Sequence, residues 1–85
     1  MSRYRVEFSS AAAKQIRKLE AQVRRKVLLA IAELETNPRP DGVEKLSAES
    51  NAWRIRIGDY RVLYEIHDRE LVIVIFRAAH RREVY

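Results

Sequence analysis

The sequence contains no cysteine, and this absence excludes disulfide scaffolds, thiolate zinc sites and cysteine nucleophiles. No apolar run approaches the roughly 18 residues of a membrane-spanning helix, and the N-terminus has no apolar signal-peptide segment. A chain of 85 residues has room for one small core and no deep cofactor-sized cavity. We therefore expect a single domain over residues 1–85 that is cytoplasmic, binds no membrane, and uses neither a metal nor a small-molecule cofactor.

Positive charge is what the sequence has in excess. It has 17 lysines and arginines against 12 acidic residues, a formal charge of +5, and 13 of the 17 are arginine. The planar guanidinium group pairs with phosphate through two hydrogen bonds, whereas the lysine ammonium is a strongly hydrated point charge. This composition favours a phosphate-bearing or acidic protein partner, and a solvated basic surface is the alternative.

Apolar spacing predicts the elements of the first half. Residues 3–8 alternate between apolar and polar, which indicates a half-buried strand. From 11 to 36 the spacing is helical and no glycine or proline interrupts it, so the sequence permits one helix of about 26 residues. A break near 20–22 would give a helical hairpin instead. Both prolines lie in the loop at 37–51, where Leu46 is the expected apolar anchor.

The last third of the chain predicts three strands joined by two short turns. Residues 53–57 and 60–67 alternate, and the glycine and aspartate at 58–59 suit a two-residue turn. Residues 71–76 are apolar at every position, as expected of a strand covered on both faces. The turn before them falls at 68–70, and a short basic tail follows.

The two-residue turn has a consequence for three arginines. It places Arg56 directly opposite Arg61, with Arg54 on the same, polar face of the sheet. Like charges in that position destabilise a sheet by a fraction of a kcal/mol, and an anion bound between them would offset the cost. We therefore expect an anion site there. The alternative is a solvated face on which these arginines pair with Glu65 or Asp59.

Arg77 could be a fourth member of this cluster. A three-residue turn at 68–70 would place Arg77 opposite Arg61, whereas a two-residue turn would place Phe76 there. Arg77 then either joins the substrate-binding arginines or only closes the sheet by pairing with a carboxylate.

Few residues near this cluster could carry acid–base chemistry. They are His67, His80 and Tyr85, together with scattered carboxylates that lack the spacing of a metal site. The sequence has no glycine-rich phosphate loop, zinc-protease motif or nucleophile elbow. What remains is metal-independent cleavage of a phosphodiester. This chemistry points to RNA, because the 2′-hydroxyl is the nucleophile and the protein need only orient it and stabilise the charged transition state.

The order of elements and two segments of sequence resemble the RelE/ParE toxin superfamily. The segments are Trp53-Arg-Ile-Arg-Ile-Gly-Asp-Tyr-Arg-Val-Leu-Tyr64 and Arg77-Ala-Ala-His-Arg-Arg-Glu-Val-Tyr85, and the second is similar to the ending of the RelE branch. The resemblance implies an α+β fold. In this fold an N-terminal strand and a helical hairpin precede a three-stranded antiparallel meander, the helices pack on one sheet face, and the arginine-bearing face stays open.

The resemblance also implies a function and partners. RelE-type toxins of type II toxin–antitoxin systems bind the ribosomal A site and cut mRNA there without a metal, and a cognate antitoxin neutralises them. The expected partners are therefore an antitoxin, the ribosome and mRNA. Two alternatives remain open: a ParE-like inhibitor that blocks DNA gyrase by binding, and an inactive relative that only binds its antitoxin.

Carried over residue by residue, the resemblance assigns roles to the arginines on the strands. Arg61 matches the residue that stabilises the phosphate in the transition state. Arg54 and Arg56 match basic positions that flank the scissile phosphate. Some relatives have lysine there, and one such lysine is a candidate general base. Arginine keeps its proton in proteins, so neither Arg54 nor Arg56 can be that base here.

The C-terminal segment supplies the other matches. Arg81 matches a basic residue near the leaving group, Tyr85 a tyrosine that stacks on the substrate or moves a proton, and His80 a position that is often histidine. Proton abstraction would pass to Tyr85 or His80. Histidine titrates near 6.5 and tyrosine near 10, so His80 is better matched to neutral pH unless the arginines shift the pKa of Tyr85.

Overall fold

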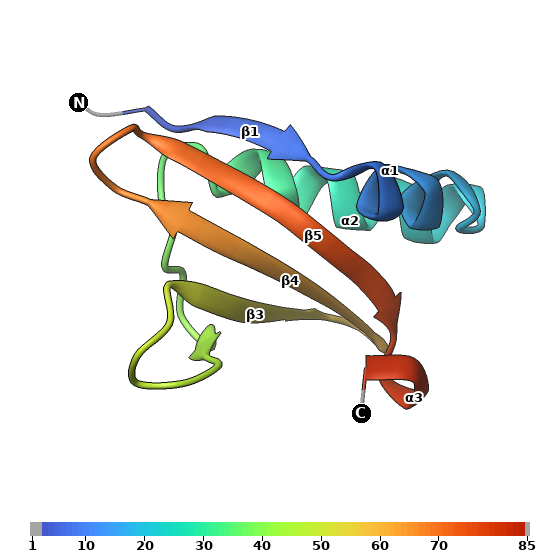
Figure 1. The fold of residues 1–85 in the computed structure, drawn as a ribbon. Helices are drawn as coiled ribbons and strands as arrows, with labels where there is room; N and C mark the ends of the chain where they lie inside the picture. The colour runs from blue at the N-terminus through green and yellow to red at the C-terminus, as the bar shows by residue number, and fades with distance from the viewer. Residues whose placement is uncertain (1–2, 85) are drawn as a thin grey trace.

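The computed structural model, which describes residues 3–84, has the predicted order of elements (Figure 1). A strand and two helices come first, a meander follows, and a short helix closes the described part of the chain. In order the elements are β1 Arg5–Phe8, α1 Ser10–Arg17, α2 Ala21–Glu33, β2 Glu44–Lys45, β3 Ala52–Ile57, β4 Tyr60–His67, β5 Val72–His80 and α3 Arg81–Val84.

The helical region forms the hairpin rather than one long helix. The Oγ of Ser9 accepts a hydrogen bond from the Ala12 N–H at 3.0 Å, which caps α1. After α1 ends, the Arg24 guanidinium donates to the Leu19 carbonyl at 3.1 Å and helps close the connection to α2. No helix within residues 3–84 is long and apolar enough to cross a bilayer.

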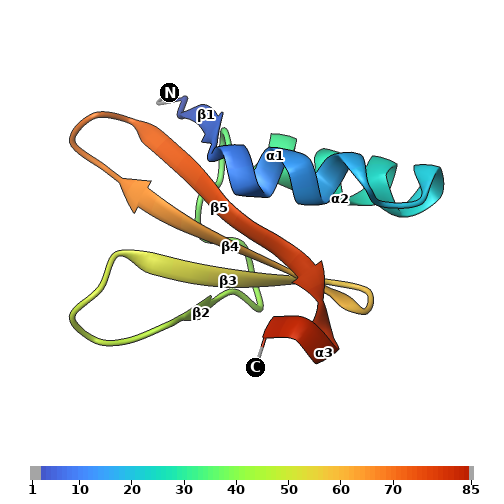
Figure 2. The same cartoon turned by 45° about the vertical axis from the view of Figure 1, so that its right-hand side comes forward.

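Five strands form one sheet in the order β1-β5-β4-β3-β2. β1 pairs with β5 in parallel and every other pair is antiparallel, so the predicted meander is confirmed. The two-residue strand β2 was not predicted, because so short a segment has no detectable alternation. Both helices of the hairpin lie on one side of the sheet, and α3 lies on the other side, at the end of β5 (Figures 1 and 2).

The core lies between the hairpin and the sheet. Apolar side chains from both layers are buried there, including Ile16, Val27, Ile31, Leu34, Val62, Tyr64, Ile66, Ile73 and Ile75. The Tyr64 hydroxyl donates to the Pro38 carbonyl at 2.8 Å and so fixes the long loop to the core. The prediction that Leu46 anchors this loop is wrong: Leu46 is exposed, and Val43 packs against the core instead.

The turns set the register of the meander. Gly58 adopts φ +60°, which glycine tolerates, and the two-residue turn pairs Ile57 with Tyr60 as predicted. Both predicted versions of the next turn are wrong. Residues 68–71 form the turn, and it ends on Leu71 at φ +56°. A bulge then leaves Phe76 without a partner on β4.

Candidate functional site

The sheet face that turns away from α1 and α2 carries arginines from three neighbouring strands. Side chains alternate between the faces along a strand, and cross-strand partners share a face. Arg56 pairs with Arg61 as predicted, and Leu63 lies between Arg54 on β3 and Arg77 on β5. We call these four arginines and the sheet surface between them the arginine face: Arg54, Arg56, Arg61 and Arg77.

The bulge in β5 decides which C-terminal residues belong to this face. One extra residue in a strand reverses which alternate side chains point to which side. With Phe76 bulged, Arg77 pairs with Leu63, and Ala79 is the residue opposite Arg61. The predicted pairing of Arg77 with Arg61 is therefore corrected, although Arg77 still joins the arginine face.

Arg61 is the most enclosed member of the arginine face, with only 7% of its surface exposed. Its Nη1 donates to the main-chain carbonyls of Tyr60 at 3.2 Å and Gly58 at 3.5 Å. Its buried Nε has no hydrogen-bond partner among residues 3–84. A buried unpaired N–H is costly, and the oxygen of a bound anion would satisfy it.

The carboxylates that the alternative required do not pair with Arg61. Glu65 is 2.9 Å from the Nε2 of His67, further along β4. Within the described part of the chain neither Glu65 nor Asp59 forms an ion pair with Arg61. Arg61 therefore faces Arg56 across the strand pair, and no acid among residues 3–84 forms an ion pair with Arg61.

The other three arginines differ in how they are held. The Arg54 guanidinium is 3.0 Å from the Glu44 carboxylate on β2. Arg56 is exposed. Arg77 donates from Nη2 to the main-chain carbonyl of Glu83 at 2.6 Å, and its buried Nε has no partner among the described residues. Arg77 thus ties α3 to the sheet through a carbonyl, not through the carboxylate that the sequence suggested.

The C-terminal candidates are divided between the two faces. β5 runs on to His80, which pairs with Tyr60 and shares its helix-side face, away from Arg61. The two rings meet edge to face with centroids 5.3 Å apart, and the Nδ1 of His80 accepts a hydrogen bond from the Arg82 N–H at 3.2 Å. Arg81 begins α3 with an exposed side chain. Tyr85 lies outside the described residues.

A second group of polar side chains lies at the opposite end of the sheet and was missed in the sequence. Asp68 accepts hydrogen bonds from the Tyr4 hydroxyl at 2.6 Å and from Arg39 at 2.8 and 3.3 Å. These bonds, those from Arg39 first, lower the pKa of Asp68. The guanidinium of Arg39 also lies 5.1 Å from the centre of the Trp53 ring.

Sequence reasoning also missed the residues that support the arginine face. Glu44 pairs with Arg54, and the carbonyls of Asp59 and Glu83 accept hydrogen bonds from Arg81 and Arg77. Main-chain acceptors leave no signal in a sequence. Among residues 3–84, no group of three or more histidine, aspartate or glutamate side chains could hold a metal ion.

Solved structures with a similar fold come from toxin–antitoxin systems. The RelE–RelB complex of Pyrococcus horikoshii contains a chain with TM-score 0.83 and 30% identity, covering 94% of this chain and 97% of that one. The intact RelBE complex of Escherichia coli gives TM-score 0.80 and 25% identity, covering 91% of this chain and 95% of that one.

Sequence comparison gives the family. Toxin RelG of Mycobacterium tuberculosis is 30% identical over 83 residues, which span 96% of this chain and 95% of that toxin. The family of the ParE toxin of the type II toxin–antitoxin system parDE matches residues 6–85. The chain belongs to this family, within the RelE/ParE superfamily, and is a toxin of a type II toxin–antitoxin system.

Proposed function

We propose that this toxin is a ribosome-dependent, metal-independent endonuclease that cuts mRNA in the ribosomal A site. The observation that carries the proposal is the setting of Arg61. This buried residue lies opposite Arg56, and its Nε has no partner in the described part of the chain. An RNA phosphate supplies the oxygen atoms that such a site lacks, and it can pair with arginine through two hydrogen bonds.

The reaction needs no nucleophile from the protein. The 2′-oxygen of the RNA attacks the adjacent phosphorus while the bond from phosphorus to the 5′-oxygen breaks, leaving a 2′,3′-cyclic phosphate and a 5′-hydroxyl. Negative charge builds up on the phosphate oxygens during this step. Arg61 would stabilise that charge, Arg54 and Arg56 would hold the flanking backbone, and Arg81 would lie near the leaving 5′-oxygen.

One proton must leave the 2′-hydroxyl and another must reach the 5′-oxygen. The ring of His80 lies on the helix-side face, and its Nδ1 lone pair accepts the hydrogen bond from the Arg82 N–H. We therefore favour Tyr85 as the residue that moves a proton. His80 then acts by holding the start of α3, where Arg81 lies.

We propose a cognate antitoxin as the protein partner. The similar RelE chains of Pyrococcus horikoshii and Escherichia coli were solved in complexes with RelB antitoxins. An antitoxin that covers the arginine face or displaces the segment from His80 to Tyr85 would block the proposed chemistry.

The name of the matching family favours a second candidate. In this ParE-like function the toxin would inhibit DNA gyrase by contact, with no bond broken by the toxin. The third candidate is an inactive relative that would only bind its antitoxin. The relatives that align along nearly the whole chain are named RelE or RelG, and this favours RNA cleavage.

The test is to add the purified toxin to a reconstituted translation reaction and to map mRNA 5′ ends by primer extension. We expect cuts within the A-site codon only when ribosomes are present. The amount of cleavage should stay the same when the divalent metal concentration is lowered to the amount that ribosomes need. A parallel gyrase supercoiling assay should show no inhibition. Intact mRNA together with inhibited gyrase would overturn the proposal in favour of the ParE-like function, and neither effect would favour the inactive relative.

A further inference from the structure

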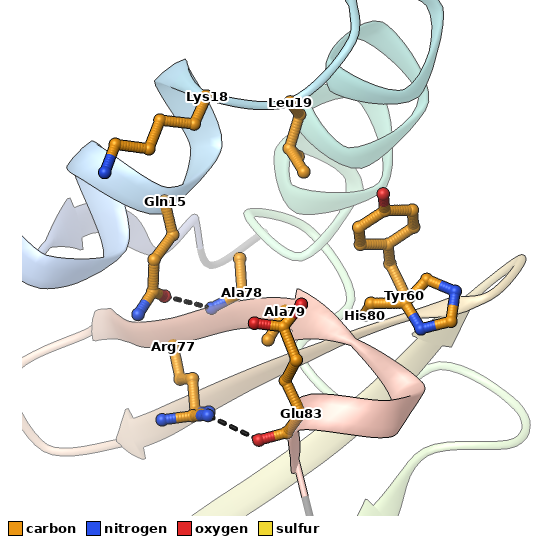
Figure 3. Close-up of a pocket in the computed structure, with 9 residues that line it drawn as sticks. All are labelled: Gln15, Lys18, Leu19, Tyr60, Arg77, Ala78, Ala79, His80 and Glu83. Atoms are coloured by element: carbon orange, nitrogen blue, oxygen red, sulfur yellow. Dashed lines mark hydrogen bonds between the residues drawn. The ribbon is translucent and has the colours of Figure 1, made fainter.

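A cavity of about 380 Å³ opens at the edge of the sheet, where α1 passes over β5 (Figure 3). β1 stops pairing with β5 at Ile75, whereas β5 continues to His80 with no strand of the described chain on that side. α1 and α3 border the remaining edge of β5. We call the space the edge cleft, and its polar lining residues are Gln15, Lys18, Tyr60, Arg77, His80 and Glu83.

The edge cleft is rich in hydrogen-bond donors. The Oε1 of Gln15 accepts a hydrogen bond from the Ala78 N–H at 2.8 Å, so the two donors of the Gln15 amide remain for a ligand (Figure 3). The Nδ1 of His80 is an acceptor for the Arg82 N–H, which assigns the proton of the neutral ring to Nε2. Lys18 adds an ammonium group from the end of α1.

The charges in the edge cleft also favour an anion. Lys18 and Arg77 are positive, and Glu83 is the single carboxylate among the lining residues. The buried Nε of Arg77 has no partner within the described part of the chain, so Arg77 retains a donor even though its Nη2 bonds the Glu83 carbonyl. A phosphate group suits such a lining, because it accepts charge-assisted hydrogen bonds from these donors.

Arg77 belongs both to the edge cleft and to the arginine face. Arg61 lies opposite Ala79, two residues along β5 from Arg77. The spacing of strands and residues in a sheet puts the Cα atoms of Arg61 and Arg77 roughly 8 Å apart. An RNA strand with one phosphate at Arg61 can therefore cross the uncovered edge of β5 over Arg77 and enter the edge cleft.

We propose that the edge cleft is a second phosphate subsite, which binds the backbone of nucleotides that flank the phosphate at Arg61. Gln15 and Lys18 hold this phosphate from α1, and Arg77 connects the two subsites. This inference rests on the proposed function, since it takes RNA to be the ligand of the arginine face. Continuity through Arg77 favours RNA over an acidic protein segment, whose binding to the cleft would not require the arginine face.

The experiment measures the binding of 2′-O-methyl oligoribonucleotides, which lack the nucleophile and cannot be cut, by fluorescence anisotropy over a range of salt concentrations. A dinucleotide with one phosphate is compared with an octanucleotide. Lys18→Gln should weaken octanucleotide binding by about fivefold and lower the salt slope by about 0.7, and should leave the dinucleotide unchanged. Lys14→Gln, the same change on the same helix but outside the cleft, should alter either affinity less than about twofold.

A substitution that removes a negative charge from the cleft gives a second test. Glu83→Gln removes the carboxylate but keeps the main-chain carbonyl that Arg77 bonds, so it should tighten octanucleotide binding by a few fold. Glu33→Gln, an exposed site at the end of α2, is the matched control. Equal effects of Lys18→Gln and Lys14→Gln, or no difference between Glu83→Gln and Glu33→Gln, would overturn the subsite.

Two further outcomes separate the possible failures. If Lys18→Gln weakens the binding of an oligoglutamate peptide but not of the octanucleotide, the cleft serves an acidic protein and the proposal is wrong. If the wild-type toxin cuts no mRNA but its octanucleotide affinity depends on Lys18, the proposed nuclease fails and the subsite stands. If the toxin cuts mRNA and Lys18→Gln binds the octanucleotide like Lys14→Gln, only the subsite fails.

Discussion

Two arginines at opposite ends of the sheet show what the same side chain does with and without a carboxylate. Arg39 bonds both oxygens of Asp68 and lies over the Trp53 ring, and 42% of its side chain is still exposed. Arg61 is only 7% exposed, faces Arg56, and has an Nε without a partner among residues 3–84. Stability alone would favour the reverse, with the more buried charge better paired.

We propose that the difference separates a structural end of the sheet from the end that binds RNA. At the Asp68 end, an ion pair and hydrogen bonds join Tyr4 just before β1, the long loop and the turn between β4 and β5. At the Arg61 end, hydrogen-bonding capacity is left for a ligand. We therefore expect substitutions at the Asp68 end to change stability and substitutions at the Arg61 end to change RNA cleavage.

Among conservative substitutions, the largest effect is expected from Arg61→Lys. Lysine keeps the charge but loses the planar fork that bonds two phosphate oxygens, so the rate of A-site cleavage should fall by roughly tenfold to a hundredfold. Single-turnover cleavage on stalled ribosomes measures it. Arg3→Lys, at an exposed pair with Glu35, is the control and should cut like the wild type. Equal rates for both variants would show that the geometry of the Arg61 guanidinium plays no part.

Tyr64→Phe tests the structural role of a buried hydroxyl group. Burial raises the pKa of Tyr64 to about 12, against about 10 in the unfolded chain. Because the unfolded state loses this proton first, the stability contributed by neutral Tyr64 is complete below about pH 10 and declines as the pH rises towards 12.

The phenylalanine variant should therefore lose less stability than the wild type between about pH 10 and 12. At neutral pH it should be less stable than the wild type by about 1 kcal/mol, because it lacks the hydrogen bond to the Pro38 carbonyl. Urea unfolding at several pH values measures both effects. Parallel declines in the two proteins would contradict the buried, neutral hydroxyl.

Asp68→Asn should have the smallest effect. Arg39 and Tyr4 lower the pKa of Asp68, so the contribution of its carboxylate is present above the unfolded value near 3.9 and is lost as the pH falls through the lower folded value. The side chain is 55% exposed, so the loss at neutral pH should stay below about 1 kcal/mol. Thermal unfolding should show that the wild type and the variant converge below about pH 4. A constant difference at all pH values would exclude the carboxylate as the cause.

The sequence predicts the parts of the site that depend on local alternation. Arg56 and Arg61 stand opposite each other because both flanking strands alternate cleanly and Gly58 can take the positive φ of a two-residue turn. The hairpin of helices followed only from the resemblance, because no glycine or proline marks its break. Packing of two short helices on one sheet face sets that break.

The register of β5 could not be predicted, for two physical reasons. Leu71 belongs to an apolar run and looks like a strand residue, yet it closes the turn at a positive φ. The bulge at Phe76 lies inside the same run and leaves no mark in the pattern. Together they place Arg77 on the arginine face and His80 on the opposite one. The edge cleft could not be predicted either. It forms because β1 stops pairing with β5 at Ile75, so that Gln15 can lie beside the rest of β5.

The assignment of Arg61 to the phosphate site is best tested by measuring the A-site cleavage rate and the thermal unfolding midpoint of Arg61→Ala and Arg39→Ala side by side. We expect Arg61→Ala to lose at least about a hundredfold in cleavage rate and to unfold at a temperature close to that of the wild type. Arg39→Ala should unfold at a lower temperature and cut within about twofold of the wild-type rate per folded molecule. Cleavage retained in Arg61→Ala with an unchanged unfolding midpoint would contradict the assignment of the arginine face as the phosphate site.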